Sequence, residues 1–516
     1  MMRASAAFAV ALFLLPGASA EFGVESERGY PIGVDGEITP FVYQHWIDKN
    51  PEVSRLVAQA QADPINKLAG LTVYPYYPIL VAELQRLATD YPDLARLHSA
   101  GKSHAGLDLY YLEIADFGNP DRVPIDSREV VYLDGGTHSN EYSGVYFVTE
   151  WAQFLLDEFE TNETARWIVE NRHTFILPMV NPDGSHAFGR INAITVNVNR
   201  NFPATWGTVD ELPGVNWPGP YPASEPETQA VINLLSNIDA DYVNSIHCCG
   251  NLWLHPFGAE HLGKPVDDQM FTQICDVVFA DVRSDCGQIW STIYPASGTT
   301  ADEGYGLLGA SSWSYEMSGR GAYSLWGQPV ITGDPREQEI ESWRGVMHAF
   351  LHVEKYGAHP VVTAIEGTGS RLEVTVHNQG YGNLTQGALT VAGQAVSFGE
   401  LPAGDVRTYT VEGDFAAGDI PVELEWKKRE HPEAKWGRTL ATSTLSKAGD
   451  RLTGTIDLPA AAPSMADLLP EQRSEEEPAL LDAGDADEGE DSPGLGLMAA
   501  LVGLAGMAAL RRRQRS

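Results

Sequence analysis

The stretch Val131-Tyr-Leu-Asp-Gly-Gly-Thr-His138-Ser-Asn-Glu141 decides which class of fold the chain can adopt. It joins a short apolar run to two glycines, where the backbone can turn, and then places a histidine and a glutamate three positions apart. Side chains at i and i+3 share one face of a helical turn, so an imidazole and a carboxylate there can bind the same Zn²⁺ ion. Because such pairs are also common as ordinary surface ion pairs, the motif predicts a metal site only together with a further ligand.

A third candidate ligand, His247, lies far along the chain from His138. It follows the apolar run Tyr242–Ile246 and precedes a Cys-Cys-Gly-Asn turn, so we expect it at the carboxyl end of a strand. Open α/β sheets place their sites at that edge, and His138 also follows a predicted strand. Two histidines and one glutamate leave the fourth tetrahedral position of one zinc ion to water, as in catalytic sites. A core histidine without a metal is the alternative for His247.

The region around these motifs alternates between two kinds of sequence. From about Val73 to Tyr356, short apolar runs are separated by stretches with helical periodicity. This alternation predicts an α/β domain at 73–357, with a mixed, mostly parallel sheet flanked by helices. Because the apolar runs are almost uninterrupted, both faces of the sheet should be covered. The expected strands include 130–133, 174–180 and 242–246, and the expected helices include 80–91 and 227–238, the second with a capping box formed by Ser224 and Glu227.

The sequence changes character after about Pro360. Apolar and polar residues alternate strictly at 371–377, 407–412 and 422–426, and turn residues recur at short intervals. This pattern predicts an all-β antiparallel sandwich at 358–460. It resembles the immunoglobulin-like domains appended to surface enzymes, and we expect it to act as a spacer or a binding module.

The two ends of the chain predict export. Residues 1–20 have a charged start, a short apolar core and a small-x-small end, which are the parts of a signal peptide. Residues 21–72 form a polar lead-in segment, and residues 461–491 form an acidic, disordered linker. Residues 492–516 combine an 18-residue apolar run with a terminal arginine cluster, which predicts a transmembrane helix or a surface-sorting segment. The protein should therefore be exported, extracellular and tethered to the cell surface.

The net charge argues against nucleic acid as a partner. The chain has 516 residues, of which 70 are acidic and 34 are basic, and its net charge is −36. A surface this acidic repels polyanions over most of its area. The sequence indicates no oligomeric state.

Four cysteines are present, and in an exported protein they can form disulfides. Four cysteines allow three pairings, and we favour Cys275–Cys286 because the adjacent Cys248 and Cys249 pair with each other only under strain.

The motifs of the α/β region, in their order, resemble those of the zinc metallocarboxypeptidase family, the relatives of pancreatic carboxypeptidases A and B. The resemblance covers residues 73–356 and is specific, because separate motifs agree in sequence. They are Gly101-Lys-Ser-His-Ala-Gly, Gly136-Thr-His138-Ser-Asn-Glu141, Asn181-Pro-Asp-Gly184, Val198-Asn199-Arg200-Asn-Phe202, Ser224-Glu-Pro-Glu-Thr228, Ile293-Tyr294-Pro-Ala-Ser-Gly298 and Ser314-Tyr-Glu316-Met.

The resemblance implies a role for each matching residue. His138, Glu141 and His247 match the zinc ligands. Glu316 matches the general base that activates water, and Arg190 matches the arginine that stabilises the oxyanion.

The same resemblance implies how a substrate is held. Asn199 and Arg200 match the pair that binds the terminal carboxylate of the substrate, for which a planar guanidinium is suited. Tyr294 matches the mobile tyrosine that closes over the same end.

Some positions depart from the family pattern. Asn140 stands where pancreatic members have an arginine, and Asn197 stands where an acid is usual, so the support of the first histidine is altered here. The positions that set specificity correspond to Gly258, Ile289 and Ala301, and none of them is charged. The pocket should therefore favour neutral or apolar C-terminal residues, unless the neighbouring Asp302 or Glu303 points into it.

The expected function is an extracellular zinc-dependent carboxypeptidase that acts on the C-termini of peptides or proteins. One alternative keeps the zinc site but acts as an amidase on cell-wall peptides. The other is a catalytically inactive surface binding protein.

Overall fold

The structure is a computed structural model, and all the residues it describes belong to one compact unit. These are residues 22–25, 31–33, 49–62, 76–119, 123–185, 189–209, 214–248, 250–280, 284–317, 335–456 and 462–463. The predicted signal peptide, the C-terminal segment at 492–516 and nearly all of the acidic linker lie outside the described residues. Within the described part of the chain, no helix combines the length and apolar character needed to cross a bilayer.

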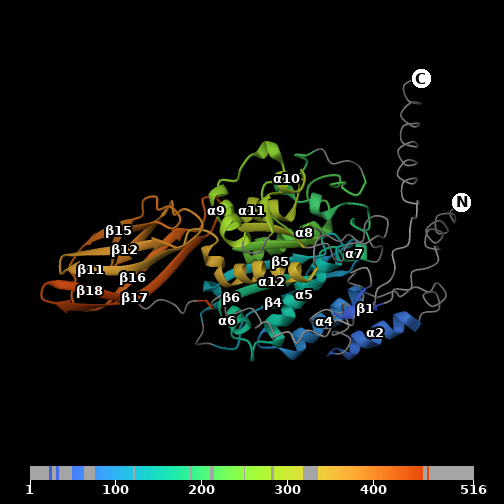
Figure 1. Ribbon diagram of the computed structural model, residues 1–516, viewed down its shortest axis with the longest axis horizontal. Coiled ribbons are helices and arrows are strands. Elements are labelled where there is room, and N and C mark those ends of the chain that lie inside the picture. Colours follow the sequence, from blue (N-terminus) through green and yellow to red (C-terminus); the bar gives the residue numbers. More distant parts are fainter. Residues whose placement is uncertain are drawn as a thin grey trace, which may run out of the picture. The chain divides into compact units, whose positions relative to one another are not determined.

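An eight-stranded mixed sheet forms the centre of the first region (Figure 1). The four central strands run parallel to one another, and antiparallel neighbours flank them on both sides. The predicted mixed, mostly parallel α/β sheet is therefore confirmed. In spatial order the strands are β3 (Ala95–Lys102), β4 (Asp108–Ile114), β6 (Arg172–Leu177), β5 (Glu129–Gly135), β7 (Tyr242–Cys248), β10 (Ser311–Met317), β8 (Leu252–His255) and β9 (Asp285–Gln288).

Helices cover both faces of this sheet (Figure 1). Val131 and Leu133 of β5 pack on one face with residues of α5 and α12, whereas Val130 and Tyr132 pack on the other face with residues of α8. The strands are apolar on both sides for this reason. The helices are α2 (Pro51–Ala62), α4 (Tyr76–Asp90), α5 (Tyr142–Asp157), α6 (Glu163–Asn171), α7 (Pro182–Ser185), α8 (Pro226–Ile238), α9 (Asp268–Ile274), α10 (Ile289–Thr292), α11 (Thr300–Leu308) and α12 (Pro335–His352), and a short hairpin of β1 (Phe22–Glu25) and β2 (Pro31–Gly33) precedes them.

The register of the central strands brings their polar residues into line. Asp134 of β5 pairs with Ser245 of β7, and His247 of β7 pairs with Glu316 of β10. Because side chains alternate along a strand, Ser245 and His247 point to the same face. The register thus gathers these four polar residues toward the carboxyl ends of β5, β7 and β10.

A glycine turn after β5 lets the chain reach His138. Gly136 has a φ of 63°, in the left-handed region that glycine adopts without strain. A Cβ atom at this position would lie 2.7 Å from the side chain of Val145 and 3.2 Å from the Cα of Met179. Any other residue would push His138 away from the sheet edge.

The predicted capping box at α8 is wrong. The helix starts at Pro226, its N-cap is Glu225, and the N-cap side chain makes no capping hydrogen bond. Ser224 instead donates to the Glu225 carboxylate, and Glu227 accepts from the backbone of His104. Tertiary contacts have therefore replaced the local hydrogen bonds that the sequence pattern predicted.

The second region is all β and antiparallel, as predicted, and its eight strands form one continuous sheet. The sheet curls so that Cα atoms of its edge strands β14 and β15 come within 8 Å of each other. The ring centres of Phe398 and Tyr409 are 5.2 Å apart. One apolar core fills the interior. In spatial order the strands are β14 (Gln394–Ser397), β13 (Gly387–Val391), β16 (Gly418–Lys427), β17 (Trp436–Ala448), β18 (Arg451–Ile456), β11 (Pro360–Thr368), β12 (Arg371–Asn378) and β15 (Val406–Glu412).

The connection between β16 and β17 binds to the α/β region through buried charges. Asp241, which directly precedes β7, accepts from Lys428 at 2.9 Å and from Lys435 at 3.1 Å. Lys428 also forms an ion pair of 2.6 Å with Glu129 of β5. Despite burial, these cations hold the pKa of Asp241 below its usual value. The second region is thus attached at the amino ends of strands whose carboxyl ends carry the polar residues.

We expect Asp241→Asn to lower the free energy of unfolding by about 3 kcal/mol, because it removes the buried counter-charge that Lys428 and Lys435 share. Asp239→Asn is the matched control, since Asp239 is 58% exposed and its ion pair with Lys435 spans 3.6 Å. That change should cost less than about 1 kcal/mol. Denaturant unfolding at neutral pH measures both, and equal losses would contradict a special role for Asp241.

The disulfide prediction is confirmed for one pair. Cys275 and Cys286 are bonded, with a Cα–Cα distance of 5.4 Å. Cys248 is also disulfide-bonded, whereas Cys249 lies outside the described residues.

Candidate active site

Two motifs that are far apart in sequence, one with His138 and Glu141 and the other with His247, meet at the carboxyl edge of the parallel strands. His138 Nδ1 lies 2.9 Å from Glu141 Oε1, and His247 Nδ1 lies 3.0 Å from Glu141 Oε2. The two Nδ1 atoms are 3.2 Å apart. All three residues are at most 3% exposed.

This donor set fits a zinc ion. Ligand atoms about 2.0–2.1 Å from a tetrahedral zinc lie about 3.3 Å from one another. The three separations given above are close to that value, and the three residues form a candidate metal group. Two imidazole nitrogens and one carboxylate are the chemistry that zinc accepts, and they leave one position open.

The protonation states of His138 and Glu141 suit metal binding. Burial, together with the nearby Arg190 charge, lowers the pKa of His138 to about 3, so its ring is neutral. Although burial raises the pKa of Glu141, its interactions with His138 and His247 hold that pKa well below its usual range. Glu141 is therefore a carboxylate and His138 a free base at neutral pH.

His138 is oriented by a neighbour on its outer side. Its Nε2 atom lies 3.1 Å from Asn197 Oδ1, and Asn197 Nδ2 donates to the carbonyl of Val215 at 3.0 Å. The second bond fixes which way the amide points, so His138 Nε2 donates and Nδ1 keeps its lone pair. An amide oxygen can therefore orient the ring at the position where the family usually has an acid.

Glu316 lies beside this group on the neighbouring strand, opposite His247. It is 8% exposed and lines the same pocket as His138. Burial and the negative charge of Glu141 raise the pKa of Glu316 to about 7. A carboxyl group with that pKa can accept and return a proton near neutral pH.

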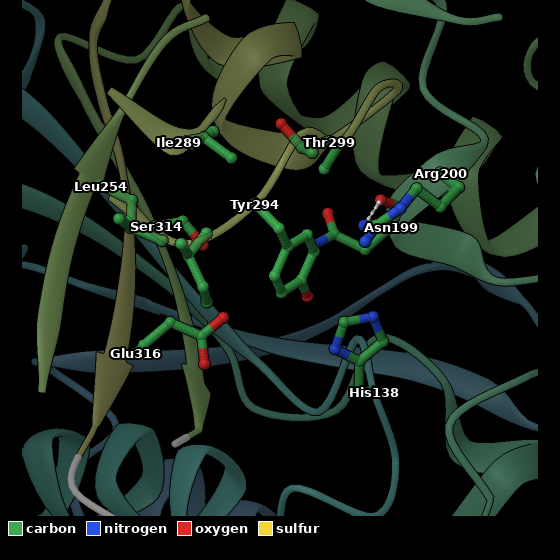
Figure 2. A pocket seen from close by; sticks show the side chains of 11 residues that line it. His138, Asn199, Arg200, Leu254, Ile289, Tyr294, Thr299, Ser314 and Glu316 are labelled. Atoms are coloured by element: carbon green, nitrogen blue, oxygen red, sulfur yellow. Dashed lines mark hydrogen bonds between the residues drawn. The ribbon is translucent and has the colours of Figure 1, made fainter. Parts of the chain in front are cut away.

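Two arginines and a tyrosine surround the opening of the site. Arg190 Nη1 forms a 2.9 Å ion pair with Glu141, and Arg190 Nη2 lies 3.4 Å from the Tyr294 hydroxyl. The Arg200 guanidinium is 5.8 Å from the Tyr294 ring centre, and its Nη1 donates to the carbonyl of Asn199. Figure 2 shows Tyr294 between Glu316 and Asn199, and the residue is 42% exposed. The structure thus brings the candidate metal ligands close to Glu316, Arg190, Asn199, Arg200 and Tyr294.

The pocket is polar on one side and apolar on the other. Its apolar side comes from β8, α10 and the segment after α10, which carry Leu254, Ile289, Ile293 and Ala296. Figure 2 shows Leu254 and Ile289 on this side. The full lining consists of His138, Asn199, Arg200, Leu254, Ile289, Ile293, Tyr294, Ala296, Thr299, Ser314 and Glu316.

Of the three predicted specificity positions, only Ile289 is among the residues that line this pocket. Ala301 lies in the same apolar cluster as Leu254, Ile289 and Ala296. Gly258 lies behind the lining, where an added Cβ would clash with the carbonyl oxygen of Ala296.

The nearby acids do not line the pocket among the described residues. Asp302 accepts from the Thr205 hydroxyl at 2.8 Å and from the backbone of Gly258, and burial raises the pKa of Asp302 to about 6. Glu303 accepts from the backbone of Ala204. Their carboxylates are therefore occupied by structural hydrogen bonds.

Sequence reasoning assigned no site role to the lining residues Leu254, Ile293, Ala296, Thr299 and Ser314. It also missed Ser245 and Asp134, which lie behind His247. Both were visible as polar residues inside otherwise apolar strands, which is the signal that could have identified them.

Comparison with known proteins agrees with this geometry. Residues 80–333 match the zinc carboxypeptidase family, and the chain therefore contains a domain of that family. Carboxypeptidase D of Homo sapiens is 29% identical over 213 residues, which are 39% of this chain and 14% of that protein. Carboxypeptidase B of Astacus astacus is 27% identical over 283 residues, which are 49% of this chain and 89% of that protein.

The chain spans under a fifth of the carboxypeptidase D proteins it matches, 14% of the human and 17% of the Anas platyrhynchos protein. Among solved structures, carboxypeptidase A of Helicoverpa armigera is similar at 22% identity with a TM-score of 0.44, over 59% of this chain and 79% of that one.

Proposed function

We propose that the protein is a zinc-dependent carboxypeptidase that hydrolyses the last peptide bond of peptides or proteins. One observation carries the proposal. His138, which belongs to the candidate metal group, lines the same pocket as Glu316 and Arg200. A metal group, a base and a fixed positive charge in one pocket are what C-terminal peptide hydrolysis requires.

The roles follow from chemistry. When bound by His138, Glu141 and His247, a zinc ion supplies Lewis-acid polarisation of the scissile carbonyl and acidifies water. Glu316 takes the proton of the attacking water and passes it to the leaving amine. Arg190 stabilises the negative charge that develops on the carbonyl oxygen.

The same pocket explains why cleavage would be restricted to the chain end. Arg200 and Asn199 bind the terminal carboxylate, and Tyr294 closes over it. Because the positive charge is fixed relative to the base, only the last peptide bond reaches the reacting groups.

Two other functions use the same fold. An amidase acting on cell-wall peptides would need the metal group but not a fixed site for a free carboxylate, so Arg200 disfavours it. A catalytically inactive binding protein would not need Glu316 in the pocket, so that residue disfavours it.

The direct test is hydrolysis of an N-blocked dipeptide, its C-terminal amide and a cell-wall peptide, each with and without a chelator. The proposal expects cleavage of the free acid alone, loss of activity with chelator, and recovery when Zn²⁺ is added. Preference for the cell-wall peptide would favour the amidase, and no hydrolysis of any of the three would favour the binding protein.

The pocket should prefer neutral or apolar C-terminal residues, because Leu254, Ile289, Ile293 and Ala296 offer no counter-charge. We expect kcat/KM for substrates ending in Leu or Phe to exceed that for substrates ending in Lys or Arg by about 100-fold. The reason is that a cationic side chain would lose hydration in the pocket without gaining a counter-charge. Ile289→Asp should raise kcat/KM for Lys and Arg, whereas the control Ile289→Asn should not. A wild-type preference for basic residues would contradict the expectation.

The chain order fits a secreted enzyme held at a surface. The proposal assigns residues 1–20 to a signal peptide, 73–357 to catalysis, 358–460 to a spacer or binding domain and 492–516 to an anchor or sorting segment. N-terminal sequencing of the mature protein tests this, since it should begin at Glu21, and a retained Met1 would contradict export.

A further inference from the structure

Two polar side chains lie behind His247, and the proposed reaction does not use them. The Ser245 hydroxyl is 3.0 Å from His247 Nε2, and it donates to Asp134 Oδ1 at 2.6 Å. His247 Nδ1 faces Glu141 and His138, so Nε2 is the outer nitrogen of the ring. A carboxylate, a hydroxyl and an imidazole thus form a chain that ends at the metal group.

The sheet itself holds this chain in place. Asp134 and Ser245 are register partners on the parallel strands β5 and β7, and His247 follows Ser245 on the same face. All three residues are 0% exposed. Earlier on that face the strands carry the core residues Tyr132 and Val243, so the polar pair replaces what would otherwise be core packing.

The direction of the hydrogen bonds follows from a metal ion on Nδ1, because the ring proton must then be on Nε2. The other contact of His247 Nε2 is Asn199 Nδ2 at 3.3 Å. Asn199 Oδ1 accepts from Thr300, so the amide nitrogen faces the ring and cannot accept a hydrogen bond from Nε2. Ser245 Oγ is therefore the acceptor available for the Nε2–H group, and the Ser245 hydroxyl donates its own hydrogen bond to Asp134.

Asp134 has no obvious structural reason to be charged. Among the described residues its hydrogen bond comes from the neutral Ser245 hydroxyl and no lysine or arginine pairs with it, although a buried carboxylate is costly without a positive partner. The positive charge that Asp134 can balance is that of a zinc ion bound by His138, Glu141 and His247, on the other side of the His247 ring. A hydrogen-bonded carboxylate makes an imidazole a better metal ligand.

We propose that Asp134 and Ser245 are positioning residues that hold His247 with its proton on Nε2 and its lone pair on Nδ1, and thereby strengthen zinc binding. The inference rests on the proposed function, because it assumes that the site binds zinc. Neither residue touches the substrate, and the effect reaches the reaction only through His247.

Zinc affinity of the full chain tests this without any assay of turnover. Ser245→Ala removes the hydroxyl bridge, and competition with a chromophoric chelator should show zinc bound about 10- to 100-fold more weakly. Ser312→Ala is the matched control, because Ser312 is also a fully buried strand serine on the adjacent β10 but pairs with Val243. Its zinc affinity should equal that of the wild type.

Asp134→Asn provides a second variant with nearly the same shape. It keeps an oxygen that can accept from Ser245 but removes the charge, so zinc should bind more weakly. The zinc-free variant should melt at the same temperature as the wild type or higher, since a buried charge has been removed. A purely structural role for Asp134 would instead lower the melting temperature and leave zinc affinity unchanged.

The outcomes separate the two proposals. If the wild type binds zinc and both Ser245→Ala and Asp134→Asn bind it equally tightly, the positioning role of Asp134 and Ser245 is excluded. The proposed function then still stands. If the wild type itself fails to bind zinc, the proposed function fails first. Combining both substitutions should cost no more affinity than Ser245→Ala alone, because the residues act in series.

Discussion

Glu316→Gln should retain zinc and lose turnover by about 1,000-fold or more. Glutamine has the size of the native side chain, so residue 316 of β10 still packs beside His247 of β7. The amide, however, cannot accept a proton from water. The measurement is kcat on an N-blocked dipeptide, together with the zinc content of the purified variant. Near-normal turnover would remove Glu316 from the mechanism.

A matched control distinguishes loss of the base from loss of any buried acid. Glu303 is 4% exposed, and burial raises its pKa as burial raises that of Glu316, yet its carboxylate binds the backbone of Ala204. Glu303→Gln should therefore leave kcat close to that of the wild type.

The pH profile gives an independent readout of Glu316. In the wild type, kcat/KM should fall as pH drops through the pKa of Glu316, because the protonated acid cannot act as a base. The residual activity of Glu316→Gln should lack this acidic limb.

Arg200→Ala should abolish the preference for a free C-terminal carboxylate. Arg200 is 2% exposed, and truncating one partner of a buried, hydrogen-bonded charge pair costs about 4 kcal/mol, or about 1,000-fold in kcat/KM. The wild type should therefore cleave a free acid far faster than the matching amide, and the variant should cleave both equally slowly. Comparison of kcat/KM for the two substrates measures this ratio.

Arg200→Lys keeps the charge but loses the planar fork, so it should show an intermediate ratio. If Arg200→Ala still discriminates strongly between the acid and the amide, another group binds the carboxylate and the assignment of Arg200 is wrong.

The sequence predicted the α/β sheet because its signal is local. The runs around Val131 and Tyr242 are apolar on both faces, and glycine or polar residues end them. The strand expected at 174–180 ends at Leu177, because Pro178 has no N–H to donate to a neighbouring strand. The meeting of His138 and His247 could also be predicted, since parallel strands bring their carboxyl ends to one edge.

Other features depend on packing between distant segments, which residue patterns do not encode. The pocket wall comes from Leu254, Ile289 and Ala296, and their convergence depends on how β8 packs beside α10 and the residues that follow it. The capping box at α8 failed because Glu225 and Glu227 found stronger partners in His104 and Asn192. The attachment of Lys428 to Asp241 joins segments 187 positions apart.

The central claim is that His138, Glu141 and His247 share one zinc ion. A crystal of the zinc-loaded protein, with anomalous diffraction recorded above and below the zinc absorption edge, tests it most directly. The account predicts a single strong peak about 2.0–2.2 Å from His138 Nδ1, His247 Nδ1 and a Glu141 oxygen. A zinc peak elsewhere, or none in the presence of excess zinc, would contradict it.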